Sequence, residues 1–553
     1  MTNGSEITFG PNRKLEVPLH ALTDSQQKTM LRVPGAVKRI GKILVPQELR
    51  LLEMLVLLVP EIQMCEGVWS WYQNERRVEK SLIKFGGRKD AQLKHFERAD
   101  ELYPFQRVGA EFINMAGRAL LCDETGLGKT ATSIAAVVSS QMMMRVLVIC
   151  PNSLKLWWAD EIRRWDPTGR RVTVANSATR EVDIKRFMSG TGWLVVNWEL
   201  ARIGTELLDQ FVWDWMICDE AHRIKNRRTL TYKSVSQLMF TRLILATGTP
   251  MSNEPGELWS LLHLLAPSEF PSYWRFYEMY TEYKANYFGG REVRGVKNSE
   301  LLRRELAPRM LRRTKKEFLP QLPDKTYKTV HVLMTPRQLK MYKQMVKESI
   351  IRLESGESVD AVGAIVVILR LQQILSTTAT LDEFDSSGKL DAACELIADA
   401  VEETKVIVFT KFRKTVEALS QRLDKGKVKH VVIMGGMTGG VAPVVKQLQE
   451  DDEVRVAVCT LQAAGEGLTM TAATKVIFLE KNYNPATQQQ AEDRVHRITQ
   501  EKAVQIITVA CRGTVDDFVQ EILERKGAMT HKVLGTELLT HLKEQEEVGV
   551  DSR

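Results

Sequence analysis

Lys129 and Thr130 close the segment Asp123-Glu124-Thr125-Gly126-Leu127-Gly128-Lys129-Thr130, which lies between two apolar runs. A strand, a glycine-containing loop and a helix in this order turn backbone N–H groups toward phosphate oxygens. We expect the Lys129 ammonium to bind the outer phosphates and the Thr130 hydroxyl to ligate magnesium. The loop backbone would bind the same phosphates through Thr125, Gly126, Leu127 and Gly128. Asp123 stands where the general phosphate-loop pattern has glycine, so a flexible strand–helix turn is the alternative.

Two acidic residues follow a second apolar run. Met216–Cys218 leads directly into Asp219 and Glu220. A buried strand that ends in two acids is unfavourable unless the acids have a role. Asp219 can hold magnesium through its water shell, and Glu220 can orient and deprotonate an attacking water. Together with the phosphate loop, this pair predicts nucleotide hydrolysis.

Two arginines far along the chain suit the same reaction. We expect the helix after Pro485 to carry Arg494 and Arg497, which at a spacing of three would share one helix face. Two guanidiniums aimed together would stabilise a phosphate chain that develops charge in a transition state. The alternative is a pair of surface salt bridges to Glu492 and Asp493.

Two weaker signals lie near the predicted nucleotide site. Gln106 lies at the start of an expected helix, shortly before the phosphate loop. Its amide can both donate to and accept from an adenine edge. An exposed helix start is the ordinary explanation for such a glutamine. Thr247-Gly248-Thr249-Pro250 follows an apolar run, and its hydroxyls could couple the nucleotide site to neighbouring loops. The alternative for this segment is a tight turn.

Short apolar runs alternate with helical stretches in two blocks of the chain. The first block, residues 120–250, has strand candidates at Val146–Cys150, Leu194–Asn197, Trp215–Cys218 and Leu243–Ala246. The second, from residue 386, has them at Val406–Phe409, Val431–Met434, Arg455–Cys459, Val476–Leu479 and Val504–Val509. This alternation predicts an α/β protein with two parallel sheets, each covered on both faces. Residues 251–385 between the blocks are less regular and rich in helix formers.

The composition is that of a water-soluble protein. The chain has 553 residues, 44% hydrophobic and 26% charged, and its net charge of +8 is compatible with a polyanionic partner. Seven scattered cysteines without a Cys-x-x-Cys pair predict a reducing compartment, no disulfides and no structural zinc. The polar residues 1–10 lack a signal-peptide core, and the longest apolar run, Leu49–Pro60, is too short to span a bilayer. We therefore expect a cytosolic protein, or a nuclear one in a eukaryotic host.

Residues 1–95 carry no catalytic pattern. Pro46–Pro60 predicts an amphipathic helix. A basic cluster follows three aromatic residues: Trp69, Trp71, Tyr72, then Arg76, Arg77, Lys80, Lys84, Arg88 and Lys89. Such a mixture suits phosphate contacts and base stacking. A solvated face beside core aromatics explains it equally well.

Taken in order over residues 100–530, these motifs resemble those of SWI/SNF-type superfamily-two helicase-like ATPases. The phosphate loop with its leading acids fits that family, and so does Cys150–Leu154 with Trp158. Asp219–Asn226 is close to the family's motif II, whose Lys225-Asn226 tail separates it from other DEAH-box proteins. Met310–Lys315 resembles a signature between the lobes, and Gln490–Gln500 resembles motif VI.

The resemblance implies two RecA-like lobes with ATP and magnesium in the cleft. It implies an accessory region at 1–95, lobes at 96–268 and 386–545, and a helical insertion at 269–385. It also implies a DNA-dependent ATPase that translocates along double-stranded or branched DNA in replication, repair or recombination. The residues that would contact DNA are Ser153, Lys155, Lys411, Gly465 and Thr469, and Gly467 would bind nucleotide.

The chain departs from the family pattern at several positions, namely Ala464, Thr469, Tyr483 and Thr499. The Gly-Leu-Thr form and the short segment between the lobes resemble the HARP-type annealing-helicase branch more than the chromatin-remodelling branch. A strand-separating DNA or RNA helicase is the alternative enzyme. A nucleotide-gated DNA clamp with little hydrolysis is the alternative of another class, and such a protein should have lost Lys129, Glu220 or Arg497.

Overall fold

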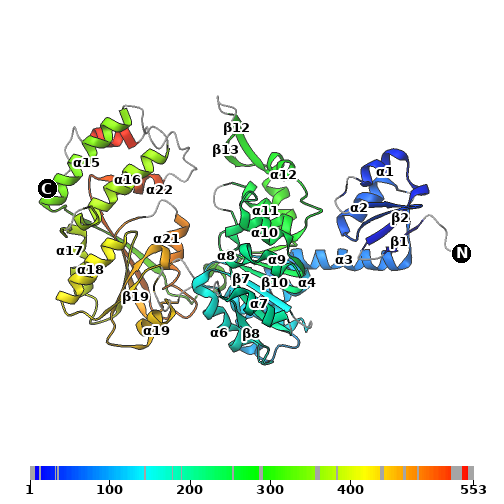
Figure 1. The fold of residues 1–553 in the computed structure, drawn as a ribbon, viewed down its shortest axis with the longest axis horizontal. Helices are drawn as coiled ribbons and strands as arrows, with labels where there is room; N and C mark the ends of the chain where they lie inside the picture. Colours follow the sequence, from blue (N-terminus) through cyan, green and yellow to red (C-terminus); the bar gives the residue numbers. More distant parts are fainter. Residues whose placement is uncertain are drawn as a thin grey trace. The chain divides into compact units, whose positions relative to one another are not determined.

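The computed structural model divides the chain into two compact units (Figure 1). The first comprises Met1–Asp123, Lys129–Cys150 and Ala159–Arg313, and the second comprises Glu124–Gly128, Pro151–Trp158 and Thr314–Arg553. The structure describes residues 6–10, 14–31, 33, 36–60, 62–141, 145–176, 179–188, 190–251, 254–285, 291–319, 321–354, 361–381, 384–435, 437, 441–464, 469–481, 485–524 and 538–545. No helix within these ranges is long and apolar enough to cross a membrane.

The larger sheet of the first unit is parallel throughout, as the alternating pattern predicts. Its order is β14-β6-β11-β10-β7-β9-β8. The strands are β6 (Arg118–Leu121), β7 (Arg145–Cys150), β8 (Val172–Val174), β9 (Gly192–Asn197), β10 (Val212–Asp219), β11 (Met239–Ala246) and β14 (Met310–Leu311). The four predicted strands of this block lie within β7, β9, β10 and β11 and are thereby confirmed.

Helices cover this sheet because its central strands are apolar on both faces. The helices are α4 (Pro104–Ala116), α5 (Lys129–Ser139), α6 (Lys155–Trp165), α7 (Arg180–Met188), α8 (Trp198–Ile203), α9 (Thr205–Leu208), α10 (Leu230–Gln237), α11 (Gly256–Leu265) and α12 (Tyr273–Tyr280). One large core includes Trp213, Met216, Leu245 and Leu262, all removed from solvent. Burial of such side chains contributes about 1.5–3 kcal/mol each, so this core holds the strand ends rigidly.

A smaller five-stranded sheet, which no sequence pattern indicated, precedes this core. Its order is β3-β4-β2-β1-β5. The strands are β1 (Glu6–Gly10), β2 (Lys14–Pro18), β3 (Val37–Arg39), β4 (Lys42–Pro46) and β5 (Gln63–Met64), with helices α1 (Asp24–Leu31), α2 (Leu49–Leu58) and α3 (Glu66–Lys84). Only the amphipathic helix is confirmed, as α2. The strands have two to five residues, too few for alternation to stand out.

The second unit is built on a six-stranded sheet that is also parallel throughout. Its order is β15-β20-β19-β16-β18-β17. The strands are β15 (Lys325–Val332), β16 (Lys405–Thr410), β17 (His430–Ile433), β18 (Val456–Thr460), β19 (Ala473–Phe478) and β20 (Val504–Cys511). The helices include α15 (Pro336–Glu354), α16 (Ala361–Ser376), α17 (Gly388–Ala398), α18 (Arg413–Lys425), α19 (Ala442–Glu450), α21 (Pro485–Glu492) and α22 (Val515–Glu524). All five predicted strands fall in this sheet.

The predicted helical insertion at 269–385 supplies strands as well as helices. β14 pairs with β6 at the edge of the first sheet, and β15 pairs with β20 at the edge of the second. β12 (Thr281–Ala285) and β13 (Arg291–Val296) pair as a hairpin. β15 is rich in β-branched Thr and Val, which favour a strand. β14 has only two residues, so it is too short to show an alternating pattern. The last segment of the first unit runs to Arg313, and the predicted boundary of the first lobe at 268 stays a prediction.

Candidate nucleotide and DNA site

Three strands of the first sheet end level with one another. Leu121 of β6 is paired with Ala246 of β11, and Ala246 is paired with Asp219 of β10. The loops that follow therefore leave from the same carboxyl edge, which is where open parallel sheets bind ligands. The Thr247 N–H donates to the Leu121 carbonyl at 3.1 Å, so the loops after β6 and β11 are in direct contact.

The predicted phosphate loop follows β6 and ends where α5 begins, at Lys129. Gly126 has φ +92° and Gly128 has φ +78°, conformations that side chains on Cβ disfavour. The Lys129 ammonium donates to the Asp123 carbonyl at 2.9 Å, and Thr130 is buried in the first turn of α5. Helix α5 has eleven residues, and its first turn follows two glycines in left-handed conformations. Such an arrangement fits the triphosphate of a nucleotide. Thr125 and Leu127 belong to the same loop.

The acidic pair lies at the end of β10. Asp219 is buried, and Glu220 adopts a left-handed backbone with φ +53°, which is uncommon for a residue with a side chain. The Glu220 carboxylate lies 3.2 Å from Nδ1 of His222, and the same nitrogen lies 3.4 Å from the Thr247 hydroxyl. These contacts provide a route for the coupling that the Thr247–Pro250 hydroxyls suggested. Thr130 and Asp219 offer the oxygen ligands that magnesium prefers.

Gln106 caps the helix in which it lies. Its side-chain oxygen accepts a hydrogen bond from the Tyr103 N–H at 3.0 Å, within a capping box at the start of α4. The side chain is buried rather than at an exposed helix start. Adenine recognition by Gln106 stays a prediction.

The expectation that Arg494 and Arg497 share a helix face is wrong. α21 ends at Glu492, and the following residues form turns. The Arg494 carbonyl accepts from the Met470 N–H at 2.8 Å, which takes the backbone off the helical path. The two arginines also differ, because Arg494 is 2% exposed whereas Arg497 is partly exposed and donates to the Thr469 hydroxyl at 2.5 Å.

The acids beside these arginines bind lysines. Asp493 lies 2.7 Å from Lys315 and 3.1 Å from Lys325, and Glu492 lies 3.1 Å from Lys325. Burial lowers the pKa of Lys315, although the Asp493 carboxylate opposes that shift. The signature segment between the blocks is thus tied to the turn that carries Arg497. No sequence pattern pointed to this contact.

The residues predicted to contact DNA have different surroundings. Ser153 lies partly exposed on a short turn after β7, whereas Lys155 is buried at the start of α6. The Thr469 hydroxyl is engaged by Arg497. Gly465 and Gly467 lie outside the described residues, so the structure does not bear on their predicted roles.

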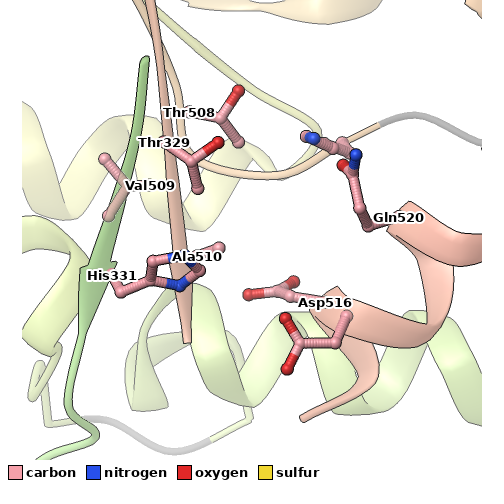
Figure 2. A pocket seen from close by; sticks show the side chains of 9 residues that line it. Thr329, His331, Thr508, Val509, Ala510, Asp516 and Gln520 are labelled. Atoms are coloured by element: carbon pink, nitrogen blue, oxygen red, sulfur yellow. The ribbon is translucent and has the colours of Figure 1, made fainter. Parts of the chain in front are cut away.

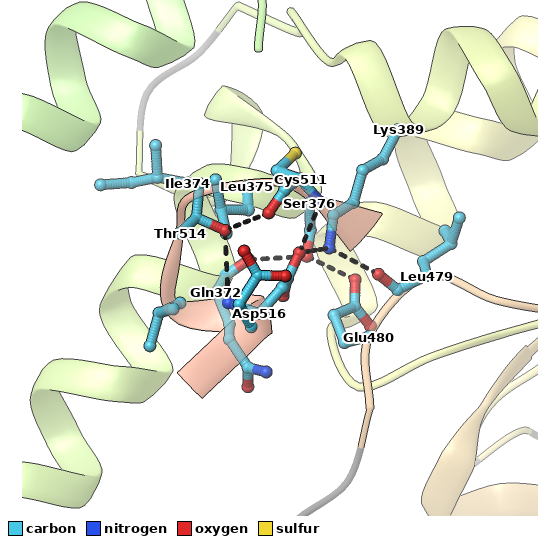
Figure 3. Close-up of polar contacts among 12 residues, drawn as sticks. Gln372, Ile374, Leu375, Ser376, Lys389, Leu479, Glu480, Cys511, Thr514 and Asp516 are labelled. Carbon is cyan, nitrogen blue, oxygen red and sulfur yellow. Dashed lines mark hydrogen bonds and ion pairs between the residues drawn. The ribbon is translucent and has the colours of Figure 1, made fainter. Parts of the chain in front are cut away.

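Lys411 follows β16 and contacts a polar network at the carboxyl edge of the second sheet. Figure 3 shows Ser376, Lys389, Glu480 and Asp516 of this network. The Lys411 ammonium donates to the Gln372 side chain at 2.9 Å, and the Lys411 N–H donates to the buried Glu480 carboxylate at 2.9 Å. Ser376 and Thr410 donate to the same carboxylate. Lys389 joins the network through the Leu479 carbonyl and Asp516, at 2.8 and 2.6 Å. Burial lowers the pKa of Lys411 to about 8.

Comparison with known protein families identifies the family to which this chain belongs. Residues 61–380, more than half of the chain, match the SNF2-related domain, and residues 388–499 match the helicase conserved C-terminal domain. The chain belongs to the SNF2-related family of helicase-like ATPases. The family assignment agrees with the expectation from the phosphate loop, the Asp219–Asn226 motif and the segment around Arg494.

Several proteins resemble this SNF2-related chain. The DNA annealing helicase and endonuclease ZRANB3 of Mus musculus is 29% identical over 78% of the chain and 41% of its own length. An uncharacterized ATP-dependent helicase of Mycoplasma genitalium is 27% identical over 79% of the chain and 42% of its own length. The Sulfolobus solfataricus SWI2/SNF2 ATPase core in complex with dsDNA matches with a TM-score of 0.39 and 24% identity, over 83% of this chain and 97% of that one. The chain spans about two fifths of the length of these curated relatives.

Two other features of this SNF2-related chain involve none of the predicted nucleotide residues. A pocket of about 150 Å³ opens beside β15, β20 and α22, with His331, Thr508, Asp516 and Gln520 in its wall (Figure 2). None of the predicted site residues lines it. Four residues of the predicted basic cluster line a groove along α3 together with Gln73 and Ser81, namely Arg76, Arg77, Lys80 and Lys84, whereas Arg88 and Lys89 do not. Its contact with nucleic acid stays a prediction.

Proposed function

We propose that this chain is an ATP-dependent translocase on double-stranded DNA. The observation that carries the proposal is the alignment of three strand ends, which sets the phosphate loop, the Asp219–Glu220 pair and the Thr247 loop side by side. Membership of the SNF2-related family supports it independently. A sequence that keeps Lys129, Glu220 and Arg497 together favours hydrolysis over the alternative of a nucleotide-gated clamp.

Each residue has a distinct role in the proposed hydrolysis. The loop N–H groups and the Lys129 ammonium bind the outer phosphates, and Gln106 contacts the adenine. Glu220 orients a water toward the terminal phosphorus and accepts its proton. Arg497 and Arg494 offset the negative charge that develops on the phosphate oxygens. Magnesium, held by Thr130 and Asp219, would neutralise part of that charge when bound.

Duplex or branched DNA is the proposed track. The relatives named ZRANB3 are described as DNA annealing helicases, and the Lys225-Asn226 tail of the acidic motif favours the translocating branch over strand-separating helicases. Ser153, Lys155, Lys411, Gly465 and Thr469 are the proposed contacts, and Gly467 is a proposed nucleotide contact. Phosphate contacts carry no sequence information, so binding should tolerate any sequence. Acting on DNA would place the protein in the cytosol, or in a nucleus.

A nucleic-acid-stimulated ATPase assay tests the proposal. Purified protein should hydrolyse ATP faster with duplex or branched DNA than with single-stranded DNA or RNA. Glu220→Gln is the matched control, because it keeps the side-chain volume and removes the base. Stronger stimulation by single-stranded RNA would overturn the substrate class. ATP binding without turnover under every condition would favour the clamp instead.

The pKa of Lys411 predicts a pH dependence of DNA binding. Its pKa of about 8 lies well below the ordinary 10.5, so the ammonium loses its charge as pH rises through 8. If Lys411 contacts a DNA phosphate, the salt slope of duplex binding should become shallower by about 0.7 between pH 7 and pH 9, because about four fifths of the charge is lost over that range. Lys411→Arg stays charged and should keep its slope over that range. An equal pH response in both proteins would show that Lys411 does not contact DNA.

A further inference from the structure

The basic signature that ends the first unit and begins the second is not a uniformly exposed surface. From Leu311 to Lys316 the side chains alternate, with Leu311, Arg313 and Lys315 buried and the residue after each of them exposed. This period of two continues the extended backbone of β14, and Thr314 has φ −108° and ψ 153°. Two positive side chains therefore point inward, where charges need partners.

Arg313 is bound to the start of the phosphate loop. Its guanidinium forms a bidentate pair with the Asp123 carboxylate, with Nε to Oδ1 at 2.9 Å, and the two side chains are 2% and 0% exposed. It also donates to the Phe105 carbonyl, next to Gln106, and lies over the Phe105 ring. One side chain thus joins the proposed phosphate-binding and adenine-binding segments. This partnership gives a reason for Asp123 at a position where phosphate loops usually have glycine.

The surroundings of Arg313 leave it little freedom. A Cβ on Gly109 of α4 would lie 2.7 Å from the Arg313 Nη2 and 2.8 Å from the Thr132 Cγ2 of α5. A side chain at residue 109 would therefore displace the Arg313 guanidinium or the Thr132 methyl group. The guanidinium is confined by α4 and α5. A displacement of residue 313 would therefore also displace the loop that connects β6 to α5.

Lys315 is bound to the turn that carries Arg497. Its ammonium lies 2.7 Å from the Asp493 carboxylate and donates to the His496 carbonyl at 2.7 Å, with side-chain exposures of 6% for Lys315 and 1% for Asp493. Arg497 donates through Nε to the Asp493 carbonyl at 3.2 Å. Lys315 therefore contacts both sides of the turn from Asp493 to Arg497. Lys325 provides Asp493 with a second positive partner at 3.1 Å.

We propose that Arg313 and Lys315 are positioning residues that couple the phosphate loop to the Arg497 turn. Arg313 and its partner Asp123 lie in the first unit, whereas Lys315 lies in the second with residues 124–128 of the loop and the Asp493–Arg497 turn. The Lys315 N–H also donates to the Glu124 carboxylate at 2.8 Å, and only Thr314 separates Arg313 from Lys315 in the chain. A displacement of one segment is passed to the other through this short extended link. The inference rests on the proposed ATPase function and adds to it the way in which DNA binding raises turnover. Buried ion pairs are costly to break singly, which makes both attachments firm.

Lengthening the link tests this coupling without removing either ion pair. Two glycines inserted between Thr314 and Lys315 should leave nucleotide affinity and basal hydrolysis near the wild-type values. Stimulation by duplex DNA should fall by at least about fivefold, the low end of coupling between sites. The matched control carries the same insertion between Gly289 and Gly290, in the segment that joins β12 to β13, and should be stimulated normally.

Full stimulation of the lengthened variant would overturn the coupling. Loss of nucleotide binding together with stimulation would overturn it too, because the effect would then not be selective. Absence of DNA stimulation in the wild-type protein would instead refute the proposed function. In that case binding of a fluorescent ATP analogue still tests Arg313 by itself.

Point variants separate positioning from simple destabilisation. Arg313→Gln should raise the KM for ATP more than it lowers kcat, and Asp123→Asn in the same chain should restore part of the loss by removing the unpaired carboxylate. Lys315→Met should lower DNA-stimulated kcat while nucleotide affinity is kept, since Lys325 still neutralises Asp493. If kcat and KM change equally in both variants, the Arg313–Asp123 and Lys315–Asp493 ion pairs serve folding alone.

Discussion

Lys129→Ala is expected to remove ATP turnover almost completely. The ammonium is the positive charge of the phosphate loop, and loss of one preorganised electrostatic contact costs about 10²–10³-fold in rate. The fold should survive, because the structure gives Lys129 a backbone carbonyl as partner rather than a buried acid that would be left unpaired. Phosphate release by the purified variant, measured with saturating duplex DNA, provides the readout.

The control for this variant is Lys185→Ala, on the exposed side of α7. It removes the same charge far along the chain from the phosphate loop and should turn over ATP normally. Duplex binding should be nearly equal in both variants, since other residues are proposed to make the DNA contacts. Near-normal turnover by Lys129→Ala would remove the basis for the nucleotide site.

The strand, loop and helix around the proposed nucleotide site could be predicted because their sequence information is local. The phosphate loop, from Asp123 to Thr130, begins two residues after the end of β6 and carries two left-handed glycines and the start of α5. The Asp219–Glu220 pair is marked by its position directly after an apolar run. Since both strands are parallel, their shared edge followed from the alternating pattern. Only the level pairing of Leu121, Ala246 and Asp219 needed the structure.

The remaining features depend on contacts between distant residues. Arg313 finds Asp123 across 190 residues of chain, and Lys315 finds Asp493 across 178. Without knowledge of these distant partners, a basic run in the sequence cannot be distinguished from a solvent-exposed helix or loop surface. The helix predicted through Arg497 failed for a similar reason, because the Met470 N–H takes the Arg494 carbonyl. Propensity is a weak guide where one tertiary hydrogen bond decides the path of the backbone.

Arg497→Ala is expected to lower DNA-stimulated turnover by about 10³-fold or more, the scale on which arginine fingers act. The partly exposed side chain donates to the Thr469 hydroxyl and to the Asp493 carbonyl. ATP affinity should fall far less, because the proposed role concerns charge that develops only in the transition state. Measuring the rate of a single turnover and the affinity for an ATP analogue separates these two effects.

Arg494→Ala is the matched comparison for this experiment. Arg494 is 2% exposed, so truncating it should lower the melting temperature as well as the rate, whereas Arg497→Ala should melt like the wild-type protein. Arg497→Lys keeps the charge but loses the planar fork and should recover only part of the rate. Equal losses of affinity and turnover in Arg497→Ala would instead make this residue a ligand of the bound nucleotide, with no special part in the transition state.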